Sequence, residues 1–196
     1  MKLSILTGLL ALAFNAMAAA QPPSFDCGKL PGNAPSAEKL VCTDLELAAL
    51  DRQLNEVYQT IVARAGDGLP PLFKAEQRGW IKGRNECWKS EDLAACVAKS
   101  YRSRTAELQA RYRLVAMKGP FSWRCDDNSE VIISYFDTEP ATAIAERGDS
   151  VSLMYVAPSG SGARYQGPSE SFWEHQGEAE VIWGFEAPVL KCTLAP

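Results

Sequence analysis

Few residues of this chain have the types and spacings that catalysis requires. His175 is the one histidine among the 196 residues, and the sequence contains no phosphate-binding glycine loop, no G-x-S-x-G and no His/Cys cluster at metal-ligand spacing. Carboxylates are numerous, but they are scattered over expected turns and strand faces. The sequence therefore predicts a binding protein with no catalytic residues, no cofactor and no metal, and a hydrolase is the least favoured class.

Two segments have the composition of a contact loop. The segment 158–165 places glycines and serines at a hairpin tip, where glycine permits positive φ and close approach, and serine supplies small donors and acceptors. The segment 172–179 ends one expected strand and begins the next. Each segment alone is also consistent with a plain hairpin. Only the resemblance described below selects individual contact residues, which are Ser159, Gly160, Ser161, Gly162, Ala163, Arg164, Tyr165, Trp173, His175 and Glu178.

Short alternating segments separated by turn residues must position these candidates. We predict eight strands, at 121–125, 131–136, 142–147, 150–157, 162–167, 169–175, 178–186 and 188–194. So many antiparallel strands in fewer than about 80 residues indicate a small closed barrel whose interior is filled by side chains. Cys125 and Cys192 fall on the first and last strands, which are neighbours in an up-and-down barrel, so a disulfide between them would seal its closure.

The preceding half has helical periodicity over 43–116. Thr43-Asp44-Leu45-Glu46 has the pattern of a capping box, Pro70-Pro71 suits the first turn of a second helix, and Ser90 is expected to cap a third. The predicted fold is α+β, with a small disulfide-braced helical bundle at 21–117 and an eight-stranded antiparallel barrel at 118–196.

The first twenty residues have the features of a secretory signal peptide. Lys2 precedes an apolar stretch and Ala16-Met17-Ala18 forms a cleavage site, with no cysteine directly after it to carry a lipid. We therefore expect a periplasmic or secreted protein without a membrane anchor.

Export in turn predicts three disulfides among the six cysteines. Cys87 and Cys96 flank a turn and are a reasonable pair, which would leave Cys27 with Cys42, but the pairing of these four stays open.

Charge divides the chain into two unlike halves. Residues 21–118 carry 15 Lys/Arg against 12 Asp/Glu, whereas residues 119–196 carry 4 against 12, a net charge of −8. An acidic C-terminal half argues against binding nucleic acid or anionic lipid and favours a basic protein partner. A solvated acidic surface that only maintains solubility is the alternative.

The two loop segments together resemble the signature motifs of the MliC/PliC family, which are periplasmic or membrane-bound inhibitors of c-type lysozyme. SGSGARY is followed by FW-x-(basic)-x-x-EA, and Ser161 lies fourteen positions before His175, the spacing between the inhibitory serine and lysine of that family. The resemblance covers residues 121–196, and Cys125 and Cys192 fit it. His175 stands where lysine is common, and Gln176-Gly177 stands where Gly-Asp is common.

This resemblance implies a plug mechanism. The Ser159–Tyr165 loop would enter the lysozyme cleft, where one protonated and one ionised carboxyl cleave the glycan. Ser161 would hydrogen-bond the catalytic acid, His175 would stand beside the ionised aspartate, and Arg164 and Tyr165 would shape the loop or its rim. The expected partner is a c-type lysozyme, a basic protein.

The helical half resembles a second family, the N-terminal domain of LprI-type lysozyme inhibitors. The match covers roughly residues 24–115, and most of its residues are of kinds that pack helices together. The segments that carry it are Pro22-Pro23-Ser24-Phe25-Asp26-Cys27, Val41-Cys42, Ala49-Leu50-Asp51, Gln77-Arg78-Gly79-Trp80, Arg84 and Cys87.

Two other classes of binder fit the same sequence. One is a peptidoglycan- or oligosaccharide-binding module that stacks sugars on Trp123, Trp173 and Trp183, although period-2 alternation directs some of these into a core. The other is a periplasmic protein-docking scaffold that uses the helical half. Lysis of cell walls by lysozyme, followed as turbidity, distinguishes an inhibitor from both.

Overall fold

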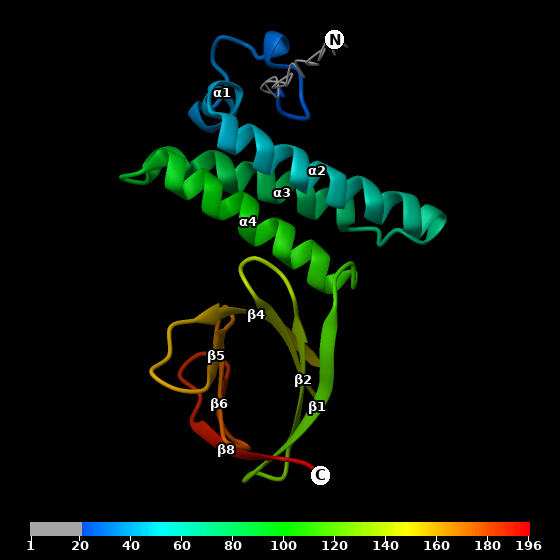
Figure 1. Ribbon diagram of the computed structural model, residues 1–196, viewed down its shortest axis with the longest axis vertical. Coiled ribbons are helices and arrows are strands. Elements are labelled where there is room, and N and C mark those ends of the chain that lie inside the picture. Colours follow the sequence, from blue (N-terminus) through cyan, green and yellow to red (C-terminus); the bar gives the residue numbers. More distant parts are fainter. Residues whose placement is uncertain (1–20) are drawn as a thin grey trace, which may run out of the picture.

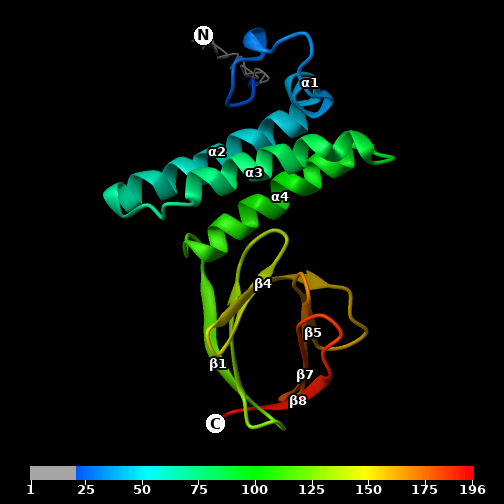
Figure 2. The same cartoon turned by 180° about the vertical axis from the view of Figure 1, so that it is seen from behind.

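A layer of helices stacked on a β-barrel makes up the computed structural model, which describes residues 21–196 (Figure 1). The expected signal peptide at 1–20 lies outside the described residues. Seen from the front and from behind, the C-terminus lies at the end of the barrel farthest from the helices (Figures 1 and 2). The helical first half and the closed eight-stranded barrel confirm the predicted α+β fold, and the structure adds one α-helix to the three that the sequence predicted.

Four α-helices and three short 3-10 helices form the first half. In chain order they are η1 (Cys27–Lys29), α1 (Ser36–Thr43), α2 (Leu45–Ala65), η2 (Gly66–Gly68), α3 (Phe73–Asn85), η3 (Glu86–Lys89) and α4 (Leu93–Arg111). The first of the α-helices was not predicted from the sequence.

Helix boundaries differ from the predicted ones because aspartates make the caps. Thr43 does not cap α2, since it is the last residue of α1; the Asp44 carboxylate accepts from the backbone N–H groups of Glu46 and Leu47 instead. Asp92, and not Ser90, caps α4 by accepting from the N–H of Ala95. In both helices, an aspartate one or two residues after the expected cap accepts hydrogen bonds from the free N–H groups of the first turn.

Buried aromatic and aliphatic side chains from all four helices form the core of this half. Phe73 is stacked on Tyr58 with ring centroids 4.9 Å apart, and Trp80 meets Tyr101 edge-on at 5.2 Å. Two disulfides brace a core of this modest size, Cys27–Cys42 and Cys87–Cys96. These are the pairs that the sequence favoured without settling.

Eight antiparallel strands close into a barrel in which each strand pairs with the next and β1 pairs with β8. The strands are β1 (Met117–Cys125), β2 (Glu130–Phe136), β3 (Thr142–Arg147), β4 (Ser150–Ala157), β5 (Ala163–Gln166), β6 (Glu170–His175), β7 (Glu178–Trp183) and β8 (Val189–Leu194). Cys125 lies opposite Cys192 in the register, and their disulfide joins the two closing strands.

The first strand begins four residues before the predicted start. Met117 and Lys118 already pair with β2, and the register shifts between Lys118 and Phe121. Pro120 has no N–H to donate to a ladder, so an irregularity at this point lets the strand continue past it. The pairing therefore extends back almost to the end of α4.

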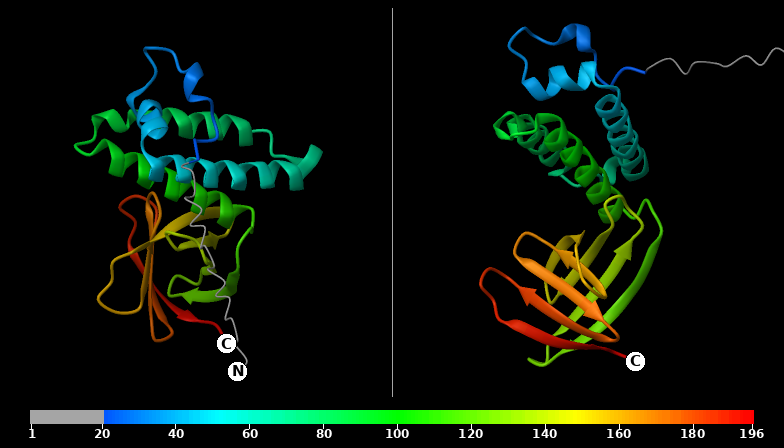
Figure 3. Two further views of the ribbon diagram at one scale, coloured as in Figure 1. Left: turned by 45° about the horizontal axis from the view of Figure 1, so that its top comes forward. Right: turned by 60° about the vertical axis from the view of Figure 1, so that its left-hand side comes forward.

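The last helix joins the two halves by packing on the outside of β2, β3 and β4 (Figure 3). Ala110 of α4 is buried with Phe136 and Leu153, and the Tyr155 hydroxyl donates to the carbonyl of Ser103 at 3.0 Å. The contact thus combines apolar burial with a hydrogen bond. It occupies strands other than those that carry the candidate contact residues.

Candidate functional site

Strand pairing brings the two candidate segments together. The loop 158–162 connects β4 to β5, and β5 pairs with β6 so that Arg164 lies opposite Trp173. The loop carrying Ser161 and the strand end carrying His175 are therefore neighbours at one end of the barrel. A separation of fourteen residues in the sequence becomes direct adjacency in the fold.

The tip of the loop is held by two hydrogen bonds to one carbonyl. The Trp173 indole N–H donates to the carbonyl oxygen of Ser161 at 2.9 Å, and the Ser159 hydroxyl donates to the same oxygen at 2.5 Å. The sequence indicated Trp173 as a contact residue, but it did not indicate that the indole holds the loop by a hydrogen bond. The indole fixes the backbone on which the exposed Ser161 hydroxyl stands.

The two loop glycines differ in what the structure demands of them. Gly162 has φ of +66°, and a Cβ added to it would lie 2.0 Å from the carbonyl oxygen of Glu174 and 3.1 Å from Cβ of His175. Only glycine fits such a position. A Cβ added to Gly160 would meet nothing within 4 Å. The loop therefore lies against the end of β6 at Gly162 and projects freely at Gly160.

The β6–β7 hairpin presents His175 and Glu178 side by side. Its two central residues, Gln176 and Gly177, have φ of +53° and +85°, as a type I′ turn requires. His175 and Glu178 face each other across this turn in the register, and both are exposed. Glutamine is unusual at such a φ, and nothing in the structure explains its presence.

A shallow groove of about 450 Å³ begins at these residues and runs across the outside of β6, β7 and β8. Trp173, His175 and Glu178 line one part of it, and Glu180 and Lys191 line another. The last two were absent from the predicted set. Alternation along β7 is the signal that places Glu180 on the same face as Glu178.

The remaining loop residues fall on two sides of the strand. Arg164 is exposed, whereas Tyr165 is partly buried with its ring centroid 5.3 Å from that of Tyr135. Burial raises the pKa of the Tyr165 phenol, and the nearby Glu174 carboxylate raises it further. The phenol is therefore neutral, and Tyr165 anchors β5 to the barrel. Ala163, half-buried, lies opposite Glu174.

The three barrel tryptophans do not form a stacking surface for sugars. Trp123 is 2% exposed in the barrel core, and Trp183 packs against the same core. Trp173 alone lines the outer groove.

Within residues 21–196 no group of three or more His, Cys, Asp or Glu is arranged to hold a metal ion, and no helix has the length and apolarity to cross a bilayer.

Comparison with known proteins finds lysozyme inhibitors for both halves. Residues 123–190 match the family described as membrane-bound lysozyme-inhibitor of c-type lysozyme, and residues 27–108 match the family described as lysozyme inhibitor LprI. Lipoprotein LprI of Mycobacterium tuberculosis, strain H37Rv, is 31% identical over 145 residues, which are 72% of this chain and 70% of the relative; that of Mycobacterium bovis matches equally.

Two solved structures are similar to the barrel half. Pseudomonas aeruginosa MliC in complex with hen egg white lysozyme is 16% identical over 41% of this chain and 86% of that chain, with a TM-score of 0.34. PliC of Salmonella typhimurium, a periplasmic inhibitor of C-type lysozyme, is 26% identical over 42% of this chain and 99% of that chain, with a TM-score of 0.34.

Proposed function

The chain belongs to the family of the lysozyme inhibitor LprI, and from this membership we propose that it inhibits c-type lysozyme by inserting the Ser159–Tyr165 loop into the active-site cleft. The observation that carries the proposal is the fixed tip of this loop. Trp173 donates to the carbonyl of Ser161 at 2.9 Å, so the exposed serine is held beside His175 before any partner arrives. A loop ordered in advance loses less conformational entropy on binding.

Two side chains supply the chemistry of recognition. In this proposal the Ser161 hydroxyl hydrogen-bonds the protonated catalytic carboxyl of lysozyme, and a ring N–H of His175 donates to the ionised aspartate. Small residues at 160 and 162 allow the tip into a cleft shaped for a sugar chain. Trp173 and Glu178 contact the rim, Arg164 flanks the loop, and no covalent step is required.

Charge favours the same partner. The barrel half carries a net charge of −8, which attracts a basic enzyme and raises the association rate more than the affinity. The helical half packs on the outside of β2 to β4, so the described helices leave the loop and the groove beside it accessible. A signal peptide would deliver the chain to the periplasm or outside, where it meets lysozyme.

Substitutions at the loop tip test the mechanism in a cell-wall turbidity assay with hen egg white lysozyme. Ser161→Ala is expected to weaken binding to lysozyme by about 1–3 kcal/mol, because it leaves the buried catalytic carboxyl of the enzyme without its hydrogen-bond partner. Ser161→Tyr is expected to weaken inhibition more, because a bulky tip cannot enter the cleft. Ser169→Tyr, in the exposed β5–β6 turn, is the matched control and is expected to inhibit normally. Full inhibition by Ser161→Tyr would exclude the plug mechanism.

A further inference from the structure

Several of the residues that carry the resemblance of the helical half line a cavity of about 540 Å³. It lies between the segment 24–30, α2 and α3, and its lining includes Phe25, Asp51, Trp80 and Arg84. These positions are distant in the sequence, and simple helix packing does not require them to meet around an open space. The cavity lies in the other half of the molecule from the proposed inhibitory loop.

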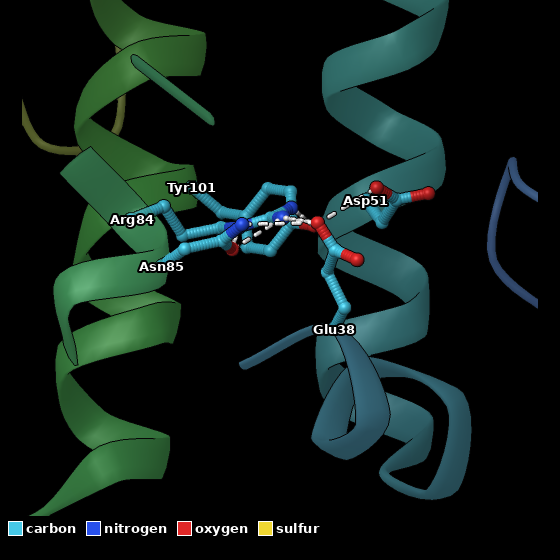
Figure 4. A network of polar contacts seen from close by, with 5 residues as sticks. All are labelled: Glu38, Asp51, Arg84, Asn85 and Tyr101. Carbon is cyan, nitrogen blue, oxygen red and sulfur yellow. Dashed lines mark hydrogen bonds and ion pairs between the residues drawn. The ribbon is translucent and has the colours of Figure 1, made fainter. Parts of the chain in front are cut away.

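A network of buried polar groups forms one wall of this cavity, with contributions from all four α-helices (Figure 4). Arg84, 5% exposed, donates to the Tyr101 hydroxyl at 2.5 Å and forms an ion pair with Glu38 at 3.4 Å. Tyr101 in turn donates to Asp51 at 2.9 Å, and Asp51 also accepts from the backbone N–H of Ser24 at 2.6 Å. The wall is therefore rigid.

The charged groups that line the cavity already have partners within the protein. Arg84 forms an ion pair with Glu38, and Lys29 forms one with Asp26 at 3.0 Å. Asp51 has hydrogen bonds in place of an ion pair: it is 7% exposed, and each of its carboxylate oxygens accepts one. An anionic ligand would therefore meet only paired cations and a cationic one only a shielded carboxylate, so an uncharged polar ligand fits this cavity best.

Aromatic faces and side-chain amides complete the lining. Phe25, Tyr58 and Trp80 offer apolar surfaces, and Asn55 and Gln59 offer amides along α2. The Trp80 indole N–H donates to the carbonyl of Ser100 at 3.3 Å, which fixes the plane of the ring. Flat aromatic faces pack against the C–H groups of a pyranose ring, while amides and carboxylates match its hydroxyl and acetamido groups in both donor and acceptor roles.

We propose that this cavity binds an uncharged oligosaccharide built from N-acetylated hexose units. Its volume lies within the range of small-molecule sites, and a few fixed polar groups among apolar walls are typical of such sites. Glycan binding by the helical half would keep the chain near the cell wall that lysozyme attacks. The site functions without the inhibitory loop.

Titration of the disulfide-bonded chain 21–196 with tri-N-acetylchitotriose, followed by calorimetry and by tryptophan fluorescence, tests this site. Asn55→Ala and Gln59→Ala together are expected to weaken binding by about tenfold or more. Gln53→Ala is the matched control, because Gln53 is exposed on the same helix outside the cavity lining, and it is expected to bind like the wild type. Trp80→Phe is expected to remove most of the fluorescence change.

Two results would overturn the glycan site: no heat and no fluorescence change at about millimolar trisaccharide, or equal binding by the wild type and the Asn55→Ala, Gln59→Ala variant. Inhibition of lysozyme is measured separately on the same proteins. The cavity variant is expected to inhibit normally and Ser161→Tyr to bind the trisaccharide normally, so failure of one proposal is distinguishable from failure of the other.

Discussion

Close docking of the Ser159–Tyr165 loop against the barrel requires glycine at position 162. A side chain there would combine an unfavourable φ with a Cβ placed 2.0 Å from the carbonyl oxygen of Glu174. Gly162→Ala is expected to reduce the free energy of unfolding by about 1–3 kcal/mol and to weaken inhibition, because the loop must move. Gly160→Ala meets open space and is expected to change stability by less than about 0.5 kcal/mol. Urea denaturation of the two variants compares them, and equal stabilities would show that the loop does not dock on β6.

His175 stands where lysine is common in the family that the barrel half resembles. Its exposed side chain lies at the end of β6, beside Gly162 of the docked loop. In the proposed complex a ring N–H of His175 donates to the ionised aspartate of lysozyme. His175→Ala removes this donor and is expected to weaken inhibition by about 1.5–3 kcal/mol, measured in the turbidity assay.

His175→Lys is the complementary variant, because a lysine ammonium can donate to the same aspartate. It is expected to inhibit at least as strongly as the wild type in the same assay. Equal inhibition by the wild type and His175→Ala would mean that His175 does not lie at the catalytic aspartate. Arg164, exposed on the neighbouring strand, would then be the next residue to substitute.

At the scale of elements, the contact between α4 and the barrel contains a partly buried tyrosine, Tyr155. Burial, together with the nearby Glu107 carboxylate, raises the pKa of Tyr155 to about 12, and the hydroxyl donates to the Ser103 carbonyl. A tyrosine titrates near about 10 when unfolded. The folded pKa is the higher one, so this contribution to stability is complete below pH 10 and is lost as the pH rises toward 12.

Tyr155→Phe therefore has two expected effects. It reduces the free energy of unfolding by about 0.5–1.5 kcal/mol at neutral pH through the lost hydrogen bond. It also flattens the loss of stability between about pH 10 and pH 12. Urea denaturation across this range gives both quantities, and an alkaline loss as steep as that of the wild type would place the titrating group elsewhere.

Element types were predictable from the sequence, whereas several boundaries were not. Period-2 alternation and turn residues located all eight strands, because each strand has one face in the core. Capping was misassigned at Thr43 and Ser90 because aspartate lies close to each and competes for the same amides. The short helix α1 escaped prediction, since eight residues give too few turns for a clear period.

At the scale of the whole molecule, the sequence predicted the fold of each half, but it did not predict the cavity in the helical half. The adjacency of Ser161 and His175 follows once β5 and β6 pair. The cavity around Trp80 depends on side chains from the N-terminal segment and two helices, whose relative placement no local pattern specifies. The residues that meet there, Asp51 and Arg84 among them, were therefore interpreted as helix packing.

The two halves have separate tasks in this account. The acidic barrel presents the loop and the groove, and the helical half packs on the opposite strands and holds the cavity. Contact through α4 and Tyr155 fixes the halves in one arrangement without covering the loop. In the proposed complex the loop occupies the catalytic cleft of lysozyme.

Binding to a lysozyme whose cleft is already filled tests that claim most directly. The dissociation constant of the chain would be measured by surface plasmon resonance against untreated lysozyme and against lysozyme that carries a covalently attached disaccharide in its cleft. A plug that enters the cleft cannot displace a covalent occupant, so affinity is expected to fall by about a hundredfold or more, a loss of about 2.7 kcal/mol. Equal affinity for the two forms of lysozyme would contradict insertion of the loop and place the interface outside the cleft.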